Sequence, residues 1–176
     1  MFSCKQNEAQ PSGNKTKAQV VARSSDSPLI GYENEDGDFV PVSDENLLEY
    51  YRSLGLLSDD GSLANVEVMQ GTEADGTTFS YLSAHGVDGE YHSKIATLVT
   101  PYNGDPSMMV AGGTTCTCKS KNCTGVWDCN SSLNNGLCSC SPCSGENADC
   151  EKTSTTSSAA AVRQFFVSIG VTAVHG

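Results

Sequence analysis

The first clear pattern along this chain is a set of apolar residues at the spacing of an α-helix. Between residues 44 and 54 they recur at the three- and four-residue spacing of one helix face, at Leu47, Leu48, Tyr51 and Leu54. Ser43 stands before this run as an N-cap, and two acidic residues in the first turn suit the helix dipole. The pattern predicts a core-packing helix over residues 44–54 that ends at Gly55.

After this helix the apolar period shortens to that of β-strands. Four β-like runs follow, at residues 65–70, 77–84, 90–100 and 107–112. Between them lie dipeptides that favour tight hairpin turns, Asp75-Gly76, Asp88-Gly89 and Asn103-Gly104. We therefore expect an α+β fold, in which a small antiparallel four-stranded meander is covered by one helix and followed by a disulfide-rich irregular lobe.

The last part of the chain is a Ser/Thr run followed by apolar residues. Residues 153–158 are expected to be extended or loose. Residues 159–169 predict a helix capped by Ser158, with a strand as the alternative, because an apolar stripe is formed by Val162, Phe165, Phe166 and Ile169. The expected organisation is a tether over residues 1–27, a folded domain over 28–115, a cysteine-rich lobe over 116–152 and a segment packing back over 153–176.

Eight of the nine cysteines fall within one short segment. They are Cys116, Cys118, Cys123, Cys129, Cys138, Cys140, Cys143 and Cys150. The segment is rich in Ser, Asn and Gly, and Trp127 is one of its few apolar residues. Because it cannot form a core of its own, it needs crosslinks or metal to hold it.

Two hypotheses account for these cysteines. Four disulfides are the first, with a connectivity left open among 105 pairings. A bridge between cysteines two residues apart is strained, so Cys116 and Cys118 are expected to bond to other partners. The second is a metal-thiolate site, because the Cys-x-Cys and Cys-x-x-Cys spacings resemble those of metallothioneins and zinc sites; that resemblance implies bound zinc or copper. We expect disulfides and no cofactor.

The first residues carry a separate signal. Met1-Phe2-Ser3-Cys4 resembles the end of a bacterial lipobox, although Leu is the usual first residue and no apolar stretch precedes it here. The polar residues that follow have the composition of a flexible tether. The resemblance implies that Cys4 is lipidated and that the protein lies in the bacterial envelope. With Cys4 set aside, the remaining eight cysteines can pair internally.

The distribution of charge along the chain narrows the range of possible binding partners. The net charge is −11, and from Asp26 to Asp105 sixteen acidic residues stand against two basic ones. Nucleic acid is excluded as a partner, because nothing in this stretch neutralises phosphates. No run of apolar residues approaches the roughly 18 that a membrane-spanning helix needs.

Other candidate chemistry is sparse. His85 and His92 flank one predicted hairpin and are a possible metal pair, but the more frequent role of such histidines is structural, and His175 stands apart near the C-terminus. The acidic stretch around Asp36 does not fit the EF-hand calcium pattern and indicates a solvated turn. No nucleophile, Walker or zinc-protease motif is present, so we expect a protein without catalytic activity.

These observations predict an accessory or binding protein of the cell envelope or of the secreted fraction. It would be lipid-anchored, held together by disulfides and in contact with another envelope protein. One alternative is a metal-handling protein that binds zinc or copper through the cysteine segment. Another is a secreted, toxin-like product, against which the acidic charge argues because membrane-active peptides are usually basic.

Overall fold

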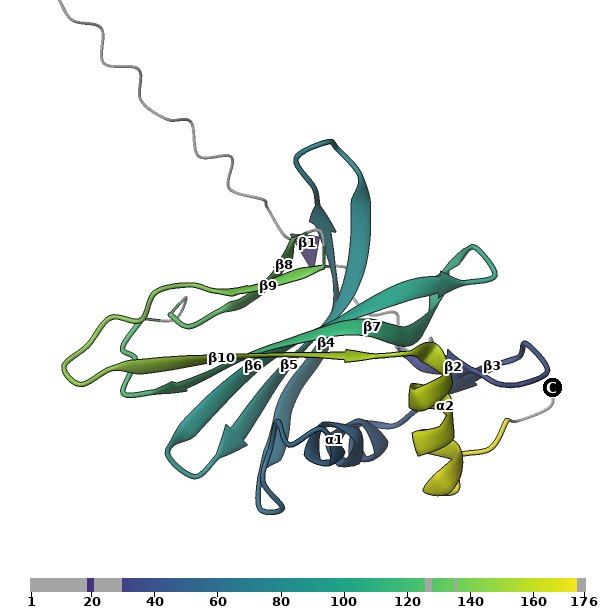
Figure 1. Cartoon of the computed structure of the whole chain (residues 1–176), viewed down its shortest axis with the longest axis horizontal. Coiled ribbons are helices and arrows are strands. Elements are labelled where there is room, and N and C mark those ends of the chain that lie inside the picture. Colours follow the sequence, from purple (N-terminus) through teal and green to yellow (C-terminus); the bar gives the residue numbers. More distant parts are fainter. Residues whose placement is uncertain (1–18, 21–29, 126–127, 135, 174–176) are drawn as a thin grey trace, which may run out of the picture.

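The computed structural model describes residues 19–20, 30–125, 128–134 and 136–173. Cys4, Trp127 and His175 lie outside these ranges. Strands make up 52% of the structure and helices 14%, so the protein is mostly β. One curled sheet forms its centre, with both helices on one side and the cysteine-rich lobe on the other (Figure 1).

The elements follow one another along the chain with short connections. They are β1 (Gln19–Val20), β2 (Gly31–Glu33), β3 (Phe39–Pro41), α1 (Asp44–Ser53), β4 (Ser62–Thr72), β5 (Thr78–Asp88), β6 (Tyr91–Tyr102), β7 (Asp105–Lys121), β8 (Ser131–Asn134), β9 (Leu137–Cys140), β10 (Asp149–Ser157) and α2 (Ala159–Ser168). The main sheet has the order β1-β4-β5-β6-β7-β2-β3, with β10 also paired to β7. Strands β8 and β9 form a separate hairpin.

The expected four-stranded meander with one covering helix is wrong. Strands β4 to β7 do pair antiparallel in sequence order, but they lie inside an eight-stranded sheet. The sheet is mixed, because β2 pairs with β7 in parallel at Gly31 and Val110. Two helices, α1 and α2, cover its apolar core.

The main cause of this error is the length of β7. The expected strand ended at residue 112, whereas β7 continues through Cys116 and Cys118 to Lys121. Gly113 has a φ of +107°, and the pairing with β6 shifts register between Thr97 and Val99. An irregularity of this kind bends a strand without ending it.

Long β7 therefore pairs with two strands along one edge. Its first half contacts β2, and its second half pairs with β10 from Gly113↔Ser157 to Lys121↔Asp149. Residues 153–157, expected to be extended or loose, are extended and belong to β10. The chain thus returns after the cysteine segment to complete the sheet.

Both predicted helices are confirmed. The Ser43 side chain caps α1 by accepting a hydrogen bond from the Asn46 amide, and Gly55 follows its end with a φ of +69°. Helix α2 is the helix rather than the strand of the two alternatives, and the Ser158 side chain accepts from the Ala161 amide at 3.1 Å. A helix of ten residues is marginal by itself, so packing on the sheet stabilises both.

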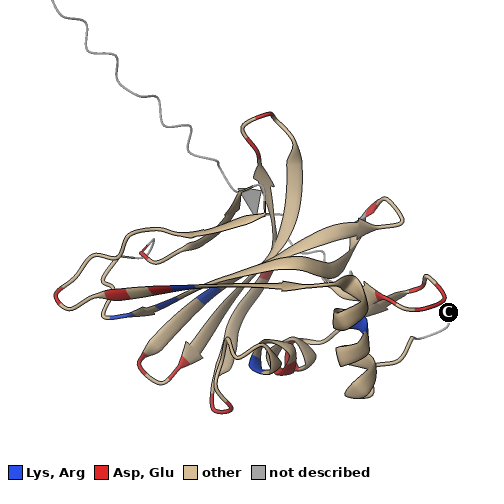
Figure 2. Ribbon diagram, in the orientation of Figure 1, with Lys and Arg blue, Asp and Glu red and all other residues tan. Residues whose placement is uncertain are grey.

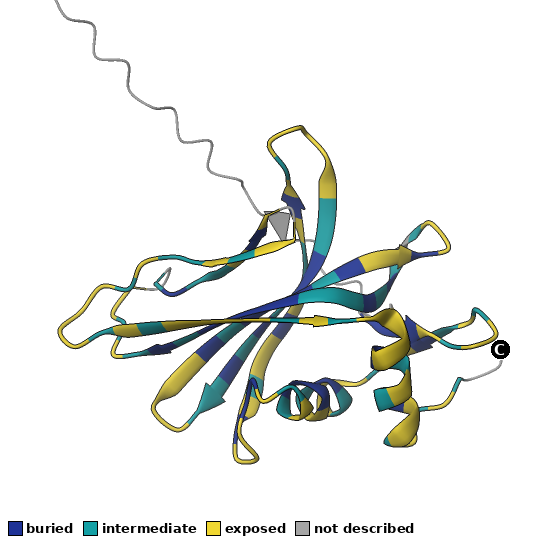
Figure 3. Ribbon diagram, viewed as in Figure 1, coloured by how far each residue is buried: buried dark blue, intermediate teal, exposed yellow. Residues whose placement is uncertain are grey.

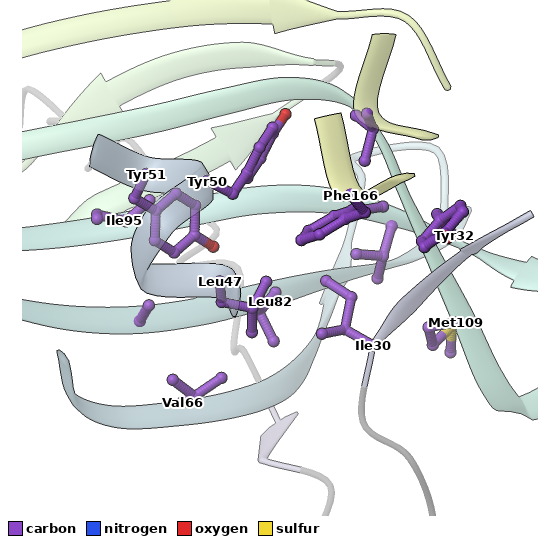
Figure 4. Packing of buried hydrophobic residues seen from close by; sticks show 14 of the residues in the cluster. Ile30, Tyr32, Leu47, Tyr50, Tyr51, Val66, Leu82, Ile95, Met109 and Phe166 are labelled. Carbon is purple, nitrogen blue, oxygen red and sulfur yellow. The ribbon is translucent and has the colours of Figure 1, made fainter. Parts of the chain in front are cut away.

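The first core lies between the sheet and the two helices (Figure 4). Aromatic rings join the helices across it, since the Phe166 ring lies 5.4 Å from Tyr32 and 5.5 Å from Tyr50. Ile30, directly before β2, and buried aliphatic residues from the strands complete it, among the latter Val40, Val66, Leu82, Ile95 and Val99. Figure 3 shows buried positions along the middle of the long strands and on α1.

Charged residues occupy the margins of the molecule. Figure 2 shows most Asp and Glu positions in the hairpin turns and loops, and several basic positions near one end of β6, β7 and β10, which include Lys119 and Lys121 of β7. These two Lys contact acidic residues of the β5–β6 turn: Lys119 lies 3.5 Å from Asp88, and Lys121 contacts Glu90. The Lys119–Asp88 pair is half-buried and Glu90 is exposed. Ion pairs that solvent reaches in this way add little stability, and the acidic excess remains on the surface.

Candidate functional site

A second core lies on the face of the sheet opposite the helices. Its buried members are Tyr81, Ala96, Cys116, Cys118, Cys129 and Leu133. We call residues 122–148, which include the β8–β9 hairpin, the disulfide lobe. The lobe supplies Cys129 and Leu133, and the sheet supplies the rest. The cysteine segment therefore has no core of its own and uses one face of the sheet instead.

Strand alternation explains how β7 serves both cores. Successive side chains of a strand point to opposite faces. Cys116 and Cys118 are fully buried in the second core, whereas Thr115 and Thr117 between and beside them are buried at the helix side. Each Cys-x-Cys motif thus places two sulfurs on one face of a strand.

Two parallel bridges join β7 to β9. Cys116 bonds to Cys138 with a Cα–Cα distance of 5.1 Å, and Cys118 bonds to Cys140 with a Cα–Cα distance of 5.7 Å. Each bridge spans 22 residues of sequence. The expectation that neighbouring cysteines bond elsewhere is confirmed, and the two bridges hold the hairpin flat against the sheet.

Two more bridges close the rest of the lobe. Cys123 bonds to Cys143, and Cys129 bonds to Cys150 of β10, with Cα–Cα distances of 5.5 and 5.6 Å. Counted in chain order from Cys116, each of the first four of these eight cysteines bonds to the cysteine four places later in the count. The expected disulfide framework is therefore present, and all eight cysteines of residues 116–150 take part in it.

These pairings bear on the metal-thiolate alternative. A metal binds the thiolate form of cysteine, and a sulfur in a disulfide is not a thiolate. The alternative therefore needs the same segment in reduced form. Among the residues that the structure describes, no group of three or more His, Cys, Asp or Glu side chains is arranged to hold a metal ion.

Asp128 organises the lobe beside these bridges. Its carboxylate accepts hydrogen bonds from the Gly125 amide at 2.9 Å, the Ser144 amide at 2.8 Å and the Ser144 hydroxyl. These bonds, those to Ser144 first, lower the pKa of Asp128. The Asp128 carbonyl also accepts from Lys94 Nζ of β6 at 3.1 Å. Nothing in the sequence marks Asp128, because its main partner lies 16 residues away.

His85 and His92 lie side by side on the face of the sheet that carries the second core. The distance from His85 Nε2 to His92 Nδ1 is 3.3 Å, and the ring centroids are 5.5 Å apart. His85 is half-buried and His92 is exposed. Desolvation, followed by the charges of His92 and Lys94, lowers the pKa of His85. The structure thus brings together the two histidines that the sequence placed on one hairpin.

A row of hydroxyl groups lies on the helix side of the same strands. The Tyr51 hydroxyl lies 3.0 Å from Thr97 Oγ1, which accepts from Thr115 at 3.2 Å. Nearby strand positions carry Ser93, Thr117 and Thr155, whose side-chain oxygens are buried and have no hydrogen-bond partner in the described part of the protein. Burial of the Tyr51 side chain strongly raises the pKa of its hydroxyl. Sequence patterns did not identify this polar layer, since threonine is ordinary in strands.

A surface cleft of about 540 Å³ separates α2 from the β2–β3 turn. Arg163 on α2 reaches across to Glu35 at 3.3 Å, and Tyr32 forms part of the wall. Its volume falls in the range of small-molecule pockets. The acidic turn beside it is held by Asn34 Oδ1, which accepts the amides of Asp36 and Asp38, as expected for a turn rather than an EF-hand loop.

Comparison of the chain with family models, curated proteins and solved structures found no match. Within the described residues, no helix has the length and apolar character needed to cross a membrane.

Proposed function

We propose that this protein is a non-catalytic accessory or binding protein of an oxidising compartment outside the cytoplasm. It is attached to a membrane through Cys4 and works as a subunit of a larger envelope assembly. The observation that supports this proposal is the pairing of all eight cysteines of residues 116–150 in disulfides. Disulfides form and persist in such compartments and are rare in the cytosol of most organisms.

The disulfide lobe provides the contact surface in this proposal. Its β8–β9 hairpin carries Leu137, whose side chain is 72% exposed, directly before the bridged Cys138. An apolar side chain held on a crosslinked hairpin loses little conformational freedom on binding, which favours affinity. Leu137 is therefore the first residue to test for contact with a partner.

The location is tested with the full-length gene in its source organism, comparing the wild-type protein with Cys4→Ser. Cells are treated with a thiol-alkylating reagent before lysis, and each fraction is analysed by intact mass. We expect the wild-type protein in the membrane fraction with eight cysteines unmodified, and the variant in the soluble extracytoplasmic fraction. Eight alkylated cysteines in the native protein would contradict the proposal and favour zinc or copper handling.

The contact surface is tested by crosslinking in the same cells. Leu137→Asp is expected to remove a crosslinked complex that the wild-type protein forms. Val167→Asp is the matched control, because Val167 is also an exposed apolar residue, at 53%, but lies on α2. Retention of the complex by Leu137→Asp would show that the lobe is not the contact surface.

A further inference from the structure

The two histidines beside the lobe share one face of the sheet. His85 of β5 pairs with Lys94, and His92 of β6 pairs with Val87, so the two histidines are diagonal neighbours across the strands. Side chains at such positions reach one another. Both project on the side of Tyr81 and Ala96, members of the second core, because these residues are an even number of positions away along the same strands.

The spacing of the two ring nitrogens matches that of two ligands on one metal ion. His85 Nε2 and His92 Nδ1 are 3.3 Å apart. With zinc–nitrogen bonds of about 2.05 Å, this separation subtends an angle of about 107° at the ion, close to the roughly 109° of a tetrahedron. A right angle at the ion, as in square-planar copper(II), would need the nitrogens about 2.9 Å apart.

We propose that His85 and His92 form a two-histidine zinc site on this face of the sheet. His85 binds through Nε2 and His92 through Nδ1, so each neutral ring carries its proton on the other nitrogen. The hydrogen bond between the two nitrogens is replaced by two metal–nitrogen bonds, which requires each ring to turn so that its nitrogen lone pair points to the ion and not along the line between the two nitrogens. Water fills the remaining positions, because the described residues contain no third His, Cys, Asp or Glu ligand there.

The surroundings permit an ion to reach this pair. The exposed His92 leaves one side of the site open to solvent, and the net charge of −11 raises the local concentration of cations. Lys94, which pairs with His85 across the strands, donates to the Asp128 carbonyl at 3.1 Å, so its ammonium group is held at the lobe. The site uses no cysteine and is thus separate from the metal-thiolate alternative.

The test uses the full, oxidised chain in a Cys4→Ser background, which removes the one cysteine outside the four bridges. Zinc chloride is titrated while the imidazole C–H resonances are followed by NMR, and calorimetry gives the stoichiometry. We expect the resonances of His85 and His92 to shift together and to saturate at one zinc per chain. Magnesium is expected to shift neither, because imidazole is a ligand for zinc rather than for magnesium.

Two substitutions decide the assignment. His92→Gln, at an exposed position, is expected to weaken zinc binding at least about tenfold, because only one imidazole ligand then remains. His175→Gln is the control and is expected to bind zinc as the parent does. Unchanged affinity in His92→Gln, or zinc shifts confined to His175, would overturn the proposal, provided that thermal unfolding shows both variants to be folded.

Discussion

At the scale of single residues, buried hydroxyl groups and close backbone approaches constrain the fold. Tyr51 is fully buried on α1, and its hydroxyl lies 3.0 Å from that of Thr97 on β6. This bond orients the helix on the sheet through a polar contact inside an apolar core. A buried hydroxyl is stable only while it is neutral and hydrogen-bonded, so Tyr51 ties the stability of the protein to pH.

Alkaline solution is expected to destabilise the protein through Tyr51. Its pKa is raised by burial, so above pH of about 10 the unfolded chain releases the proton while the folded chain keeps it. The free energy of unfolding then falls with pH, by up to about 1.4 kcal/mol per unit from this one group. Urea unfolding between pH 8 and 11, with Cys4 alkylated, measures the slope.

The slope should become shallower in Tyr51→Phe, at a cost of about 1 kcal/mol near neutral pH from the lost hydrogen bond. Tyr91→Phe is the matched control for the loss of a tyrosine hydroxyl, because Tyr91 is exposed. An equal slope in Tyr51→Phe and the wild-type protein would show that Tyr51 does not carry the effect.

Gly31 occupies a position where any side chain would clash, whereas Gly112 has room for a methyl group. A Cβ at Gly31 would lie 2.1 Å from the Val40 carbonyl oxygen and 2.6 Å from the Phe39 ring, whereas a Cβ at Gly112 would make an ordinary 3.4 Å contact with Ala159. Gly31→Ala should therefore destabilise the protein by about 1–3 kcal/mol, and Gly112→Ala should change stability by less than about 0.5 kcal/mol. Equal effects in thermal or urea unfolding would contradict this explanation.

At the scale of elements, β7 connects everything else. It pairs with β6 along one edge and with β2 and β10 along the other, and its two faces contribute to both cores. Two disulfides connect it to β9. Bridges of similar loop length should restrict the unfolded chain equally, so any difference between them reports their packing in the folded protein.

Removal of a bridge with one fully buried cysteine should cost more than removal of a bridge between two half-buried cysteines. Cys116–Cys138 closes 22 residues and Cys123–Cys143 closes 20, so each should lose about 3 kcal/mol of loop entropy. Cys116 is fully buried and Cys123 is not, and the cavity left in the second core should add about 1 kcal/mol to the double substitution Cys116→Ala/Cys138→Ala. Urea unfolding compares it with Cys123→Ala/Cys143→Ala; an equal or smaller cost would contradict the buried packing of Cys116.

At the scale of the whole molecule, the sheet separates two cores of different construction. The helix-side core is built from aliphatic and aromatic residues and contains no cysteine among its described members. The lobe-side core contains Cys116, Cys118 and Cys129. The first core rests on the hydrophobic effect, and the second depends on crosslinks.

Mild reduction of the disulfides should therefore destabilise the lobe side of the sheet before the helix side. We expect amide hydrogens of β8 and β9 to lose protection from exchange first, while those of β4, β5 and β6 remain protected by the helix-side core. Hydrogen exchange followed by mass spectrometry, before and after reduction, measures this order. Simultaneous loss of protection in all five strands would show that the protein behaves as one cooperative unit.

The sequence by itself determined the features that depend on near neighbours. Helix α1 with its Ser43 cap, helix α2 with its Ser158 cap, and the hairpin turns at Gly76, Gly89 and Gly104 follow from residues a few positions apart. The density of cysteines indicated disulfides for the same reason, because a segment with few apolar residues needs crosslinks.

Tertiary structure decided what depends on distant partners. The course of β7 beyond residue 112, the addition of β10 to its edge and the order of the four bridges all arise from pairing across some 20 residues or more. The contact of Asp128 with Ser144, 16 residues away, and that of Tyr51 with Thr97, 46 residues away, also depend on the tertiary structure. Such contacts depend on which elements meet in three dimensions, and the alternation of a single strand does not specify its neighbours.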